Sequence, residues 1–520
     1  MTHKLLSICL FVSLLASSAW AQSRQVSGKV TSKDDGLGMP GVNVLIQGTA
    51  KGTTTDLEGN FNIQLDPGEN NLVFTFVGYK SLVVEVGAQT QLNVSLETDI
   101  TALEEVVVVG YGTQRKVDIT GSITQLEGQE ISKQSSINPI SSLQGKVAGV
   151  QITNSGAPGS APQIRIRGTG SVYGSPDPLY VVDGVWVSDA TFINPADIEN
   201  ISILKDPSSQ SIYGVRAANG VVLITTKKGI QGRKPSITYD GFVGNQIATN
   251  LVDMASGPEY AQMINELDAI NGVTTLRFQN PASYGTTDWY RQILRSAYIS
   301  NHNLSITGGS ENSNYNFSLG YLKQQGTVKS NDFERFTLRL QNDIRPLSFV
   351  KLGYSFNGSI NTSNDVNNGI FNQMYTAAPL VPVYYADGTY GDPSDFGVGN
   401  SNLFNPQVTI DFNDQVSRNY RLVANAYAEI DFAKHFKFRS SLGTNFGQNE
   451  IESFTPVYAA TLSQRATISS LSRTRSEVRD WLLENTVTYQ NNFKEHSLNV
   501  LVGQGSQYYR TYGYRFGIQN

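Results

Sequence analysis

The chain has 520 residues and a formal net charge of -5, with 16% charged and 10% aromatic residues, nearly all of the aromatics Tyr and Phe. Low charge with many aromatic residues excludes a disordered chain. The mildly acidic balance, without a basic stripe, argues against a nucleic-acid-binding protein. Many Tyr, Phe, Gly and Asn residues instead predict a mostly β fold with one wet and one apolar face.

The N-terminus has the signature of a cleaved export signal. Lys4 precedes an apolar run at residues 5–15, and Ala19-Trp20-Ala21 fits the small-x-small cleavage rule. The apolar run is too short to cross a bilayer as a helix. We therefore expect a signal peptide over residues 1–21, removal of the single cysteine with it, and export from the cytoplasm.

Residues 22–98 predict a small β-sandwich. Short β-branched or alternating runs are separated by turn pairs such as Pro40-Gly41 and Gly59-Asn60. The ordered motifs PGVNV, GTTTD and GNF resemble the carboxypeptidase-regulatory-like domain. The resemblance implies a folded spacer or docking module without catalytic residues.

Residues 99–116 differ from the segments on both sides. Val106–Val109 are four consecutive valines, flanked by Glu104 and Glu105 before them and by two glycines after them. Valine has high strand propensity, so the run can add to a partner as an edge strand through main-chain hydrogen bonds. An ordinary buried strand is the alternative. The position between two domains favours an exposed linker.

Residues 117–230 predict a compact α+β unit, with a helix expected at residues 195–200 that starts at Pro195. The stretches PDPLYVVDGVWV and NPADIENISILKDPSSQSIYGVRAANGVVLITTKKG form a long ordered match. They resemble the plug of SusC/RagA-like TonB-linked (TonB-dependent) outer-membrane transporters. EEVVVVGYGTQRK resembles the TonB box of that family, whose usual N-terminal extension is a regulatory-like sandwich.

The resemblance also implies functional positions. It assigns TonB binding to Glu105, Val106, Val107, Val108, Val109 and Gly110. It assigns a plug–barrel contact to Arg165, Arg167 and Gly168. It places the family plug motif at Asp183, Gly184, Arg216, Ala217, Asn219 and Gly220.

Two of these groups can also be interpreted from their chemistry alone. Arg165 and Arg167 lie two apart on an expected strand and point to one face. There they would need carboxylates of the barrel wall as partners, and a solvated polar edge is the alternative. Glu429 and Asp431 face the lumen in the expected strand phase, without being assigned as those partners. The Asn219-Gly220 pair favours a tight turn over a ligand site.

Residues 231–520 supply an independent argument for a membrane barrel. Apolar and polar residues alternate repeatedly, as at 314–321 and 336–341. Long connections at 248–298 and 362–417 alternate with short ones at 309–312 and 433–434, which is the asymmetry of outer-membrane barrels. Further breaks at 447–478 and 504–506 give about ten strands of 9–11 residues.

About ten strands close too narrow a barrel to hold a plug, whereas the plugged transporters have about 22. We therefore expect the first part of a transmembrane antiparallel β-barrel, with its C-terminal part missing. The histidines show no metal-ligand spacing, and no catalytic cluster is apparent. No cofactor, no metal and no enzymatic activity are expected.

The predicted function is TonB-dependent import of a large nutrient across the outer membrane. The resemblance implies as partners TonB with its inner-membrane energising complex, a SusD-like lipoprotein, and an oligosaccharide or peptide substrate. The alternative is a secreted multidomain all-β adhesin or structural protein. The sequence leaves the substrate open.

Overall fold

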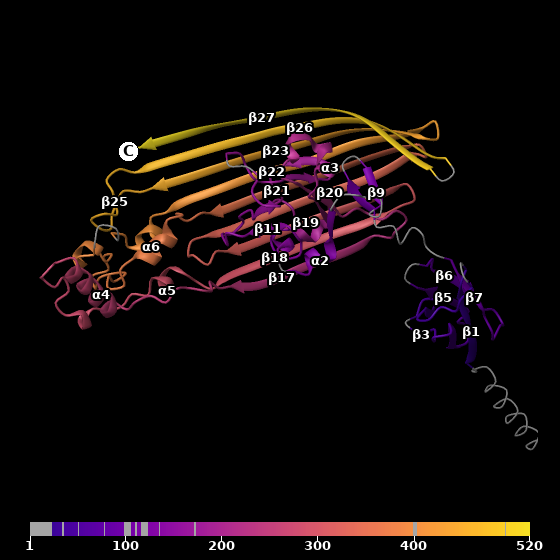
Figure 1. Cartoon of the computed structure of the whole chain (residues 1–520), viewed down its shortest axis with the longest axis horizontal. Helices are drawn as coiled ribbons and strands as arrows, with labels where there is room; N and C mark the ends of the chain where they lie inside the picture. The colour runs from indigo at the N-terminus through magenta and orange to yellow at the C-terminus, as the bar shows by residue number, and fades with distance from the viewer. Residues whose placement is uncertain are drawn as a thin grey trace, which may run out of the picture. The chain divides into compact units, whose positions relative to one another are not determined.

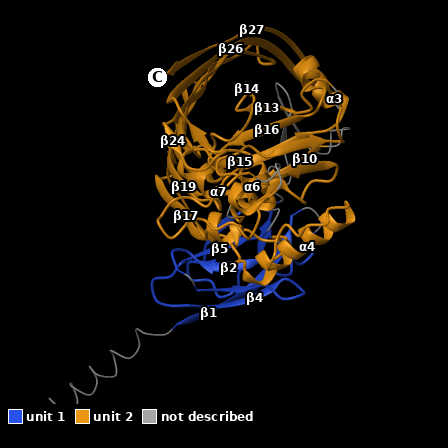
Figure 2. Ribbon diagram, turned by 90° about the vertical axis from the view of Figure 1, so that its left-hand side faces the viewer, with its two compact units in different colours: residues 1–120 blue, residues 121–520 orange. Residues whose placement is uncertain are grey.

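A computed structural model describes most of the chain after the expected signal peptide. The described residues are 23–33, 36–49, 51–76, 79–97, 106–109, 112–115, 123–134, 136–170, 173–398, 403–493 and 496–520. The predicted signal peptide, Glu105 and Gly110 lie outside them. The chain forms two compact units, Met1–Thr120 and Gly121–Asn520 (Figure 2), which are described separately below.

The first unit contains a β-sandwich of two sheets. One has the order β4-β1-β7 and the other β3-β2-β5-β6. The strands are β1 (Arg24–Ser32), β2 (Asn43–Ile46), β3 (Gly52–Thr54), β4 (Asn60–Leu65), β5 (Asn71–Thr75), β6 (Leu82–Glu85) and β7 (Val94–Leu96). Along β4, exposed and buried residues alternate strictly, and Phe61 packs edge-on against Phe74 at 5.4 Å between ring centroids. The predicted sandwich is confirmed.

The four-valine segment of the first unit is a strand with a local partner. β8 (Val106–Val109) pairs antiparallel with β9 (Gly112–Arg115), so that Val107 lies opposite Gln114. These strands form a two-stranded sheet, so each uses only one of its two edges for pairing within the described residues.

The second unit begins with a small α+β body. Its five-stranded sheet has the order β10-β15-β16-β13-β14, and β11 and β12 form a separate hairpin. The strands are β10 (Ile123–Glu127), β11 (Val150–Thr153), β12 (Gln163–Ile166), β13 (Leu179–Val182), β14 (Val185–Val187), β15 (Ile198–Leu204) and β16 (Val221–Thr226). The short helices are α2 (Gly128–Ser132), η3 (Ser141–Leu143), η4 (Pro195–Asp197), α3 (Pro207–Gln210) and η5 (Ser211–Ala217).

The helix expected at residues 195–200 is shorter than predicted. Only η4 is helical, and β15 starts directly after it at Ile198. Ile198, Ile201 and Ile203 are fully buried in the core. Burying these β-branched side chains in the sheet overrides the local helix signal.

The rest of the second unit is one antiparallel sheet of nine strands in chain order (Figure 1). The strands are β17 (Ser236–Gln246), β18 (Ala297–Gly309), β19 (Ser313–Gln325), β20 (Asp332–Leu347), β21 (Val350–Asn364), β22 (Asp414–Phe432), β23 (Phe436–Thr455), β26 (Ser470–Phe493) and β27 (His496–Gln519). β17 and β27 do not pair with each other, so the described sheet is open. This confirms the mostly β fold with an unclosed barrel sheet.

The strand count of about ten is corrected to nine in this sheet. The turn expected at 504–506 lies inside β27, whose pairing with β26 continues through Gly503 and Gly505 without a register shift. The break expected at 447–478 shrinks, because β23 extends to Thr455 and β26 starts at Ser470. The glycines and charged residues of these two segments favour turns in the sequence. In the structure, the long ladder of main-chain hydrogen bonds keeps them in strands.

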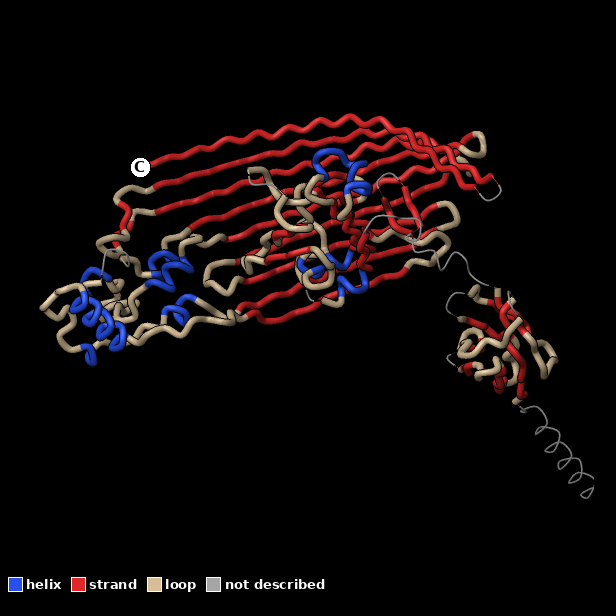
Figure 3. Tube along the Cα trace, viewed as in Figure 1, coloured by secondary structure: helices blue, strands red, loops and turns tan. Residues whose placement is uncertain are grey.

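The long connections between strands contain short helices, and the end of the sheet where they lie is called the loop end. Figure 3 shows them gathered at one end of the strands, while the connections at the other end are short turns. They contain α4 (Gly257–Ile270), η6 (Pro281–Ser283), α5 (Trp289–Ile293), α6 (Ile370–Thr376), η7 (Pro393–Phe396) and α7 (Pro406–Asp411), with the strand pair β24 (Tyr458–Ala459) and β25 (Arg465–Ala466). None of the helices among the described residues has the length and apolar character to cross a bilayer.

Candidate functional site: the contact between the α+β body and the barrel sheet

The α+β body lies inside the curve of the nine-stranded sheet, where Figure 2 shows β13 to β16 within the arc. Along β19 the even-numbered residues turn toward this body, and Asn316 and Ser318 are 2% and 1% exposed. Buried polar groups require hydrogen-bond partners. The inward face of the sheet is polar because it packs against the polar surface of the α+β body.

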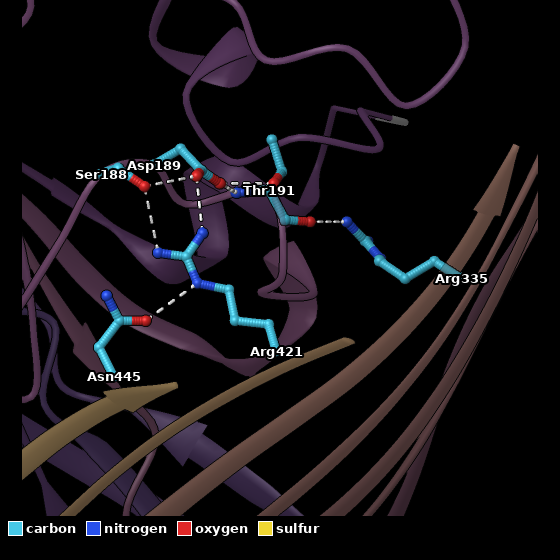
Figure 4. A network of polar contacts seen from close by, with 6 residues as sticks. All are labelled: Ser188, Asp189, Thr191, Arg335, Arg421 and Asn445. Atoms are coloured by element: carbon cyan, nitrogen blue, oxygen red, sulfur yellow. Dashed lines mark hydrogen bonds and ion pairs between the residues drawn. The ribbon is translucent and has the colours of Figure 1, made fainter. Parts of the chain in front are cut away.

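Arg421 of β22 makes an ion pair between the sheet and the body (Figure 4). Its Nη1 lies 2.6 Å from Asp189 Oδ2, and its Nη2 donates to Ser188 Oγ at 3.3 Å. Its Nε donates to Asn445 Oδ1 on β23 at 3.3 Å. The guanidinium also stacks over Phe192, 4.7 Å from the ring centroid. One side chain thus fixes the body by charge, hydrogen bonds and ring contact.

The ion pair determines the protonation of Asp189. Burial raises the pKa of this carboxyl, but the positive charge of Arg421 and hydrogen bonds from Thr191 and Arg421 lower it by more, so the pKa lies below its ordinary value. Thr191 donates to Asp189 Oδ1 through its amide at 3.0 Å and through its hydroxyl at 2.5 Å. Asp189 is therefore an anion at neutral pH.

Two further arginines reach the body from β20. Arg335 donates to the carbonyls of Thr191 and Ile137, the former shown in Figure 4. Arg339 donates to the carbonyl of Lys227 at 2.7 Å and also to Thr226 Oγ1. Arg335 and Arg339 are 3% and 2% exposed. They bind mainly backbone oxygens, which fixes position without requiring carboxylates.

Side-chain amides extend the contact along the sheet. Asn303 of β18 donates to Asp197 Oδ1 at 3.1 Å, and Asn425 of β22 donates to the carbonyl of Asp183 at 2.8 Å. These hydrogen bonds join individual side chains to single side-chain or main-chain oxygens, and they do not form a continuous strand ladder. Each of them can therefore break without the others. The contact is thus specific and yet composed of separable hydrogen bonds.

The prediction that Arg165 and Arg167 bind carboxylates of the barrel wall is wrong. Arg165 pairs with Asp177 at 2.7 Å and Arg167 with Asp206 at 2.5 Å, both within the α+β body and not on the barrel wall. β12 ends at Ile166 and Arg167 has φ 56°, followed by Gly168 at φ 92°. The chain turns there, so the two side chains do not share a strand face.

The barrel carboxylates considered for that role pair on the sheet itself. Glu429 forms an ion pair with Arg439, and Asp431 lies 3.9 Å from Lys437. The charge arrangement across the Arg421 contact is opposite to the expected one, with the arginine on the sheet and the carboxylate on the body.

Asp183 and Gly184 form the turn between β13 and β14. Their φ angles are 47° and 87°, and two successive positive φ values fit the turn that best matches strand twist. The Asp183 carboxylate accepts from the Thr226 amide at 3.0 Å and from its hydroxyl at 2.6 Å. The motif therefore fixes a hairpin against β16 and presents the Asp183 carbonyl to the barrel sheet.

The remaining motif residues include an unexpected barrel contact. The Arg216 guanidinium lies 5.7 Å from the ring centroid of Trp186 and 5.9 Å from that of Tyr509 on β27. Ala217 is fully buried, and the Gly220 amide donates to its carbonyl at 2.9 Å in a tight turn. Asn219 Nδ2 donates to the Ser175 carbonyl at 2.7 Å.

Replacement of Gly220 by alanine should destabilise this turn. Gly220 has φ 101°, and an added Cβ would lie 2.6 Å from Ile166 Cδ1. Left-handed strain and overpacking together should cost about 2–4 kcal/mol in the free energy of unfolding, measured by urea denaturation of the purified protein. Gly232→Ala is the control: φ is 73° with no atom near the added Cβ, so about 1 kcal/mol is expected. Equal losses would contradict the packing argument.

Arg335, Arg421 and Asp189 were not predicted from the sequence, and Arg339 was covered only as a polar position of the alternating run 336–341. A usable signal exists, since each arginine stands at a polar-phase position of a strand whose other face is apolar. Within the described part of the chain, no group of three or more His, Cys, Asp or Glu residues could hold a metal ion.

Comparison with known proteins agrees with this arrangement. The model of the TonB-dependent receptor plug domain matches residues 115–221, and that of the CarboxypepD_reg-like domain matches residues 26–108. TonB-dependent receptor SusC of Bacteroides thetaiotaomicron is 42% identical over 62% of this chain and 32% of its own length. The chain is SusC/RagA-like. The α+β body is accordingly called the plug below.

Longer matches extend over the barrel sheet. TonB-dependent receptor P3 of Formosa agariphila is 35% identical over 97% of this chain and 50% of its own length. The RagAB peptide importer in its open-open state has a TM-score of 0.68 at 25% identity, covering 80% of this chain and 50% of that one. This SusC/RagA-like chain spans about half the length of the curated relatives it matches.

Proposed function

We propose that the chain is part of a TonB-dependent outer-membrane transporter that imports a large nutrient through a plugged barrel. The observation that carries this is the plug, held against the inward face of a barrel sheet by Arg335, Arg339 and Arg421. A force on the plug can exchange these bonds one by one for water and open a path. The relatives are receptors and not enzymes, in keeping with this function.

TonB is the proposed source of that force, and β8 is the proposed grip. Among the described residues β8 pairs only with β9, along one edge, and its other edge is the proposed place of strand addition by a partner. Glu105, Val106, Val107, Val108, Val109 and Gly110 make up the proposed TonB-binding segment. Energy would come from the inner-membrane complex that drives TonB.

The loop end of the sheet is the proposed entry for substrate. Four rings form a continuous series there, with centroid distances of 5.1 Å (Tyr384–Tyr390), 6.1 Å (Tyr390–Phe412) and 4.0 Å (Phe412–Tyr458). Such rings can stack on sugars or on peptide side chains. The substrate class is therefore oligosaccharide or peptide, delivered with a SusD-like lipoprotein on the outer face. The proposed location is the outer membrane, after removal of the signal peptide.

Isolation of the full-length receptor from cells tests this function. We expect it in the outer-membrane fraction after a carbonate wash, together with an outer lipoprotein and a bound oligosaccharide or peptide that mass spectrometry identifies. Recovery in the culture medium, without lipoprotein or ligand, would contradict transport and support a secreted adhesin.

A further inference from the structure

The outward face of β26 and β27 carries an unusual pair of arginines. The pairing of these strands has no register shift, so outward and inward residues can be followed without interruption. Tyr509 faces the plug residue Arg216, and its neighbours Tyr508 and Arg510 therefore face outward. Arg510 lies directly opposite Arg479 across the two strands.

Like charges placed directly opposite each other destabilise a sheet. The repulsion between Arg479 and Arg510 is only partly compensated by neighbouring groups. Arg479 Nε lies 2.6 Å from Glu477 Oε1, and the Tyr512 ring contacts both guanidiniums, at 5.2 Å from Arg479 and 5.7 Å from Arg510.

A third arginine adds to this charge. Arg475 lies two residues from Glu477 on the same face and donates to the neutral amide oxygen of Gln448 at 2.5 Å. We define Arg475, Arg479 and Arg510, with Glu477, as the arginine patch. Glu450 lies directly opposite Arg475, and its Oε1 is 3.5 Å from Arg473 Nε. With Glu450 counted, three positive charges face two negative ones, and the net positive charge suits an anion.

A stacked aromatic pair lies beside the patch on the outward face. Next to Arg479 and Arg510, on the side away from the loop end, Trp481 and Tyr508 stack at 5.9 Å between ring centroids. Outer-membrane barrels carry such aromatic residues at the membrane interfaces. If the barrel spans the outer membrane as proposed above, the patch lies at the outer headgroup layer.

An apolar groove adjoins the patch on the same outward face. It has a volume of about 700 Å³ and extends across the sheet from Tyr239 on β17 to Phe446 on β23. Gly358 lies between Leu338 and Leu422 in its floor, so that the absence of a side chain deepens it. Phe446 lies directly opposite Arg479, so the groove ends at the patch.

We propose that groove and patch together bind an anionic lipid of the outer leaflet, with an acyl chain in the groove and its phosphate on Arg479 and Arg510. A guanidinium matches phosphate with two parallel hydrogen bonds, and the lipid charge would relieve the repulsion between the two arginines. Charge complementarity at one end and apolar lining along the rest select an amphipathic anion. This inference rests on the proposed outer-membrane location.

The test measures lipid binding to the purified full-length receptor by native mass spectrometry. The probes are phosphatidylglycerol and phosphatidylcholine with identical chains. We expect wild type to prefer phosphatidylglycerol, and the Arg479→Gln/Arg510→Gln double variant to bind it about tenfold more weakly. Arg515→Gln is the matched control, because Arg515 lies on β27 near the same end but faces inward, with Nε 3.2 Å from Ser472 Oγ. It should bind as wild type does.

A second variant tests the groove independently of the charges. Gly358→Leu should weaken binding of long-chain phosphatidylglycerol several-fold and leave binding of a six-carbon-chain analogue unchanged, since only the long chain fills the groove floor. Equal wild-type binding of both headgroups would overturn the proposal. So would a double variant that keeps phosphatidylglycerol but loses the outer lipoprotein, which would make the patch a protein interface. A receptor found outside the outer membrane would refute the proposed function instead.

Discussion

Val107→Pro in the full-length receptor is expected to abolish energised uptake and to leave surface binding of substrate at the wild-type level. Strand addition by TonB depends on main-chain hydrogen bonds of β8, and proline removes a donor and disfavours the ladder. Val107→Ala keeps the backbone and should lose far less uptake. The measurements are transport of labelled substrate in whole cells and its binding at the surface.

The pairing of β8 with β9 supplies a matched control for this prediction. Gln114 lies opposite Val107, so Gln114→Pro disturbs the same hairpin while the Val107 donor remains. We expect Gln114→Pro to retain uptake. Loss of uptake in both proline variants would assign the effect to the hairpin and not to TonB. Loss of folded receptor with Val107→Ala would make the valines a buried strand.

Asp189→Asn is expected to loosen the plug by about 2–3 kcal/mol, because it leaves the Arg421 guanidinium without its counter-charge. Breaking fully buried pairs costs about 3–5 kcal/mol, but the Asp189 side chain is 28% exposed and water offsets part of the loss. Urea denaturation, combined with protease sensitivity of the plug, measures the effect. Arg421→Met should cost a similar amount.

The double variant decides whether the pair acts as a unit. Asp189→Asn with Arg421→Met leaves neither charge unpaired, so its cost should fall clearly below the sum of the single variants. Additive costs would contradict a direct coupling. Arg421→Lys should recover only part of the stability, since one ammonium group cannot make all three of the polar contacts described for Arg421.

The same ion pair gives plug stability a pH dependence. The folded-state pKa of Asp189 is lowered, so its contribution is fully present above the ordinary aspartate pKa of 3.8 and is lost as pH falls through the folded value. The expected loss therefore lies below about pH 4. Asp189→Asn should remove this part of the acid sensitivity and leave the range from pH 5 to 8 unaffected.

Local patterns were sufficient for much of the fold. Alternation at residues 314–321 gave the two faces of β19, the valine run gave β8, and turn residues separated the sandwich strands. These features depend on side-chain period and strand propensity, which neighbouring residues determine. Gly503 and Gly505 show the limit, because the same residues fit a turn or a strand until a partner strand is present.

The sequence by itself determined the order of sandwich, four-valine strand, plug and barrel strands, because propensity and period act over a few neighbouring residues. Only the tertiary structure decided which charges hold the plug. Arg421 and Asp189 are 232 residues apart, and their meeting depends on the register of successive strands. The prediction for Arg167 failed because its positive φ turns the chain, and an arginine in a sequence does not predict a positive φ.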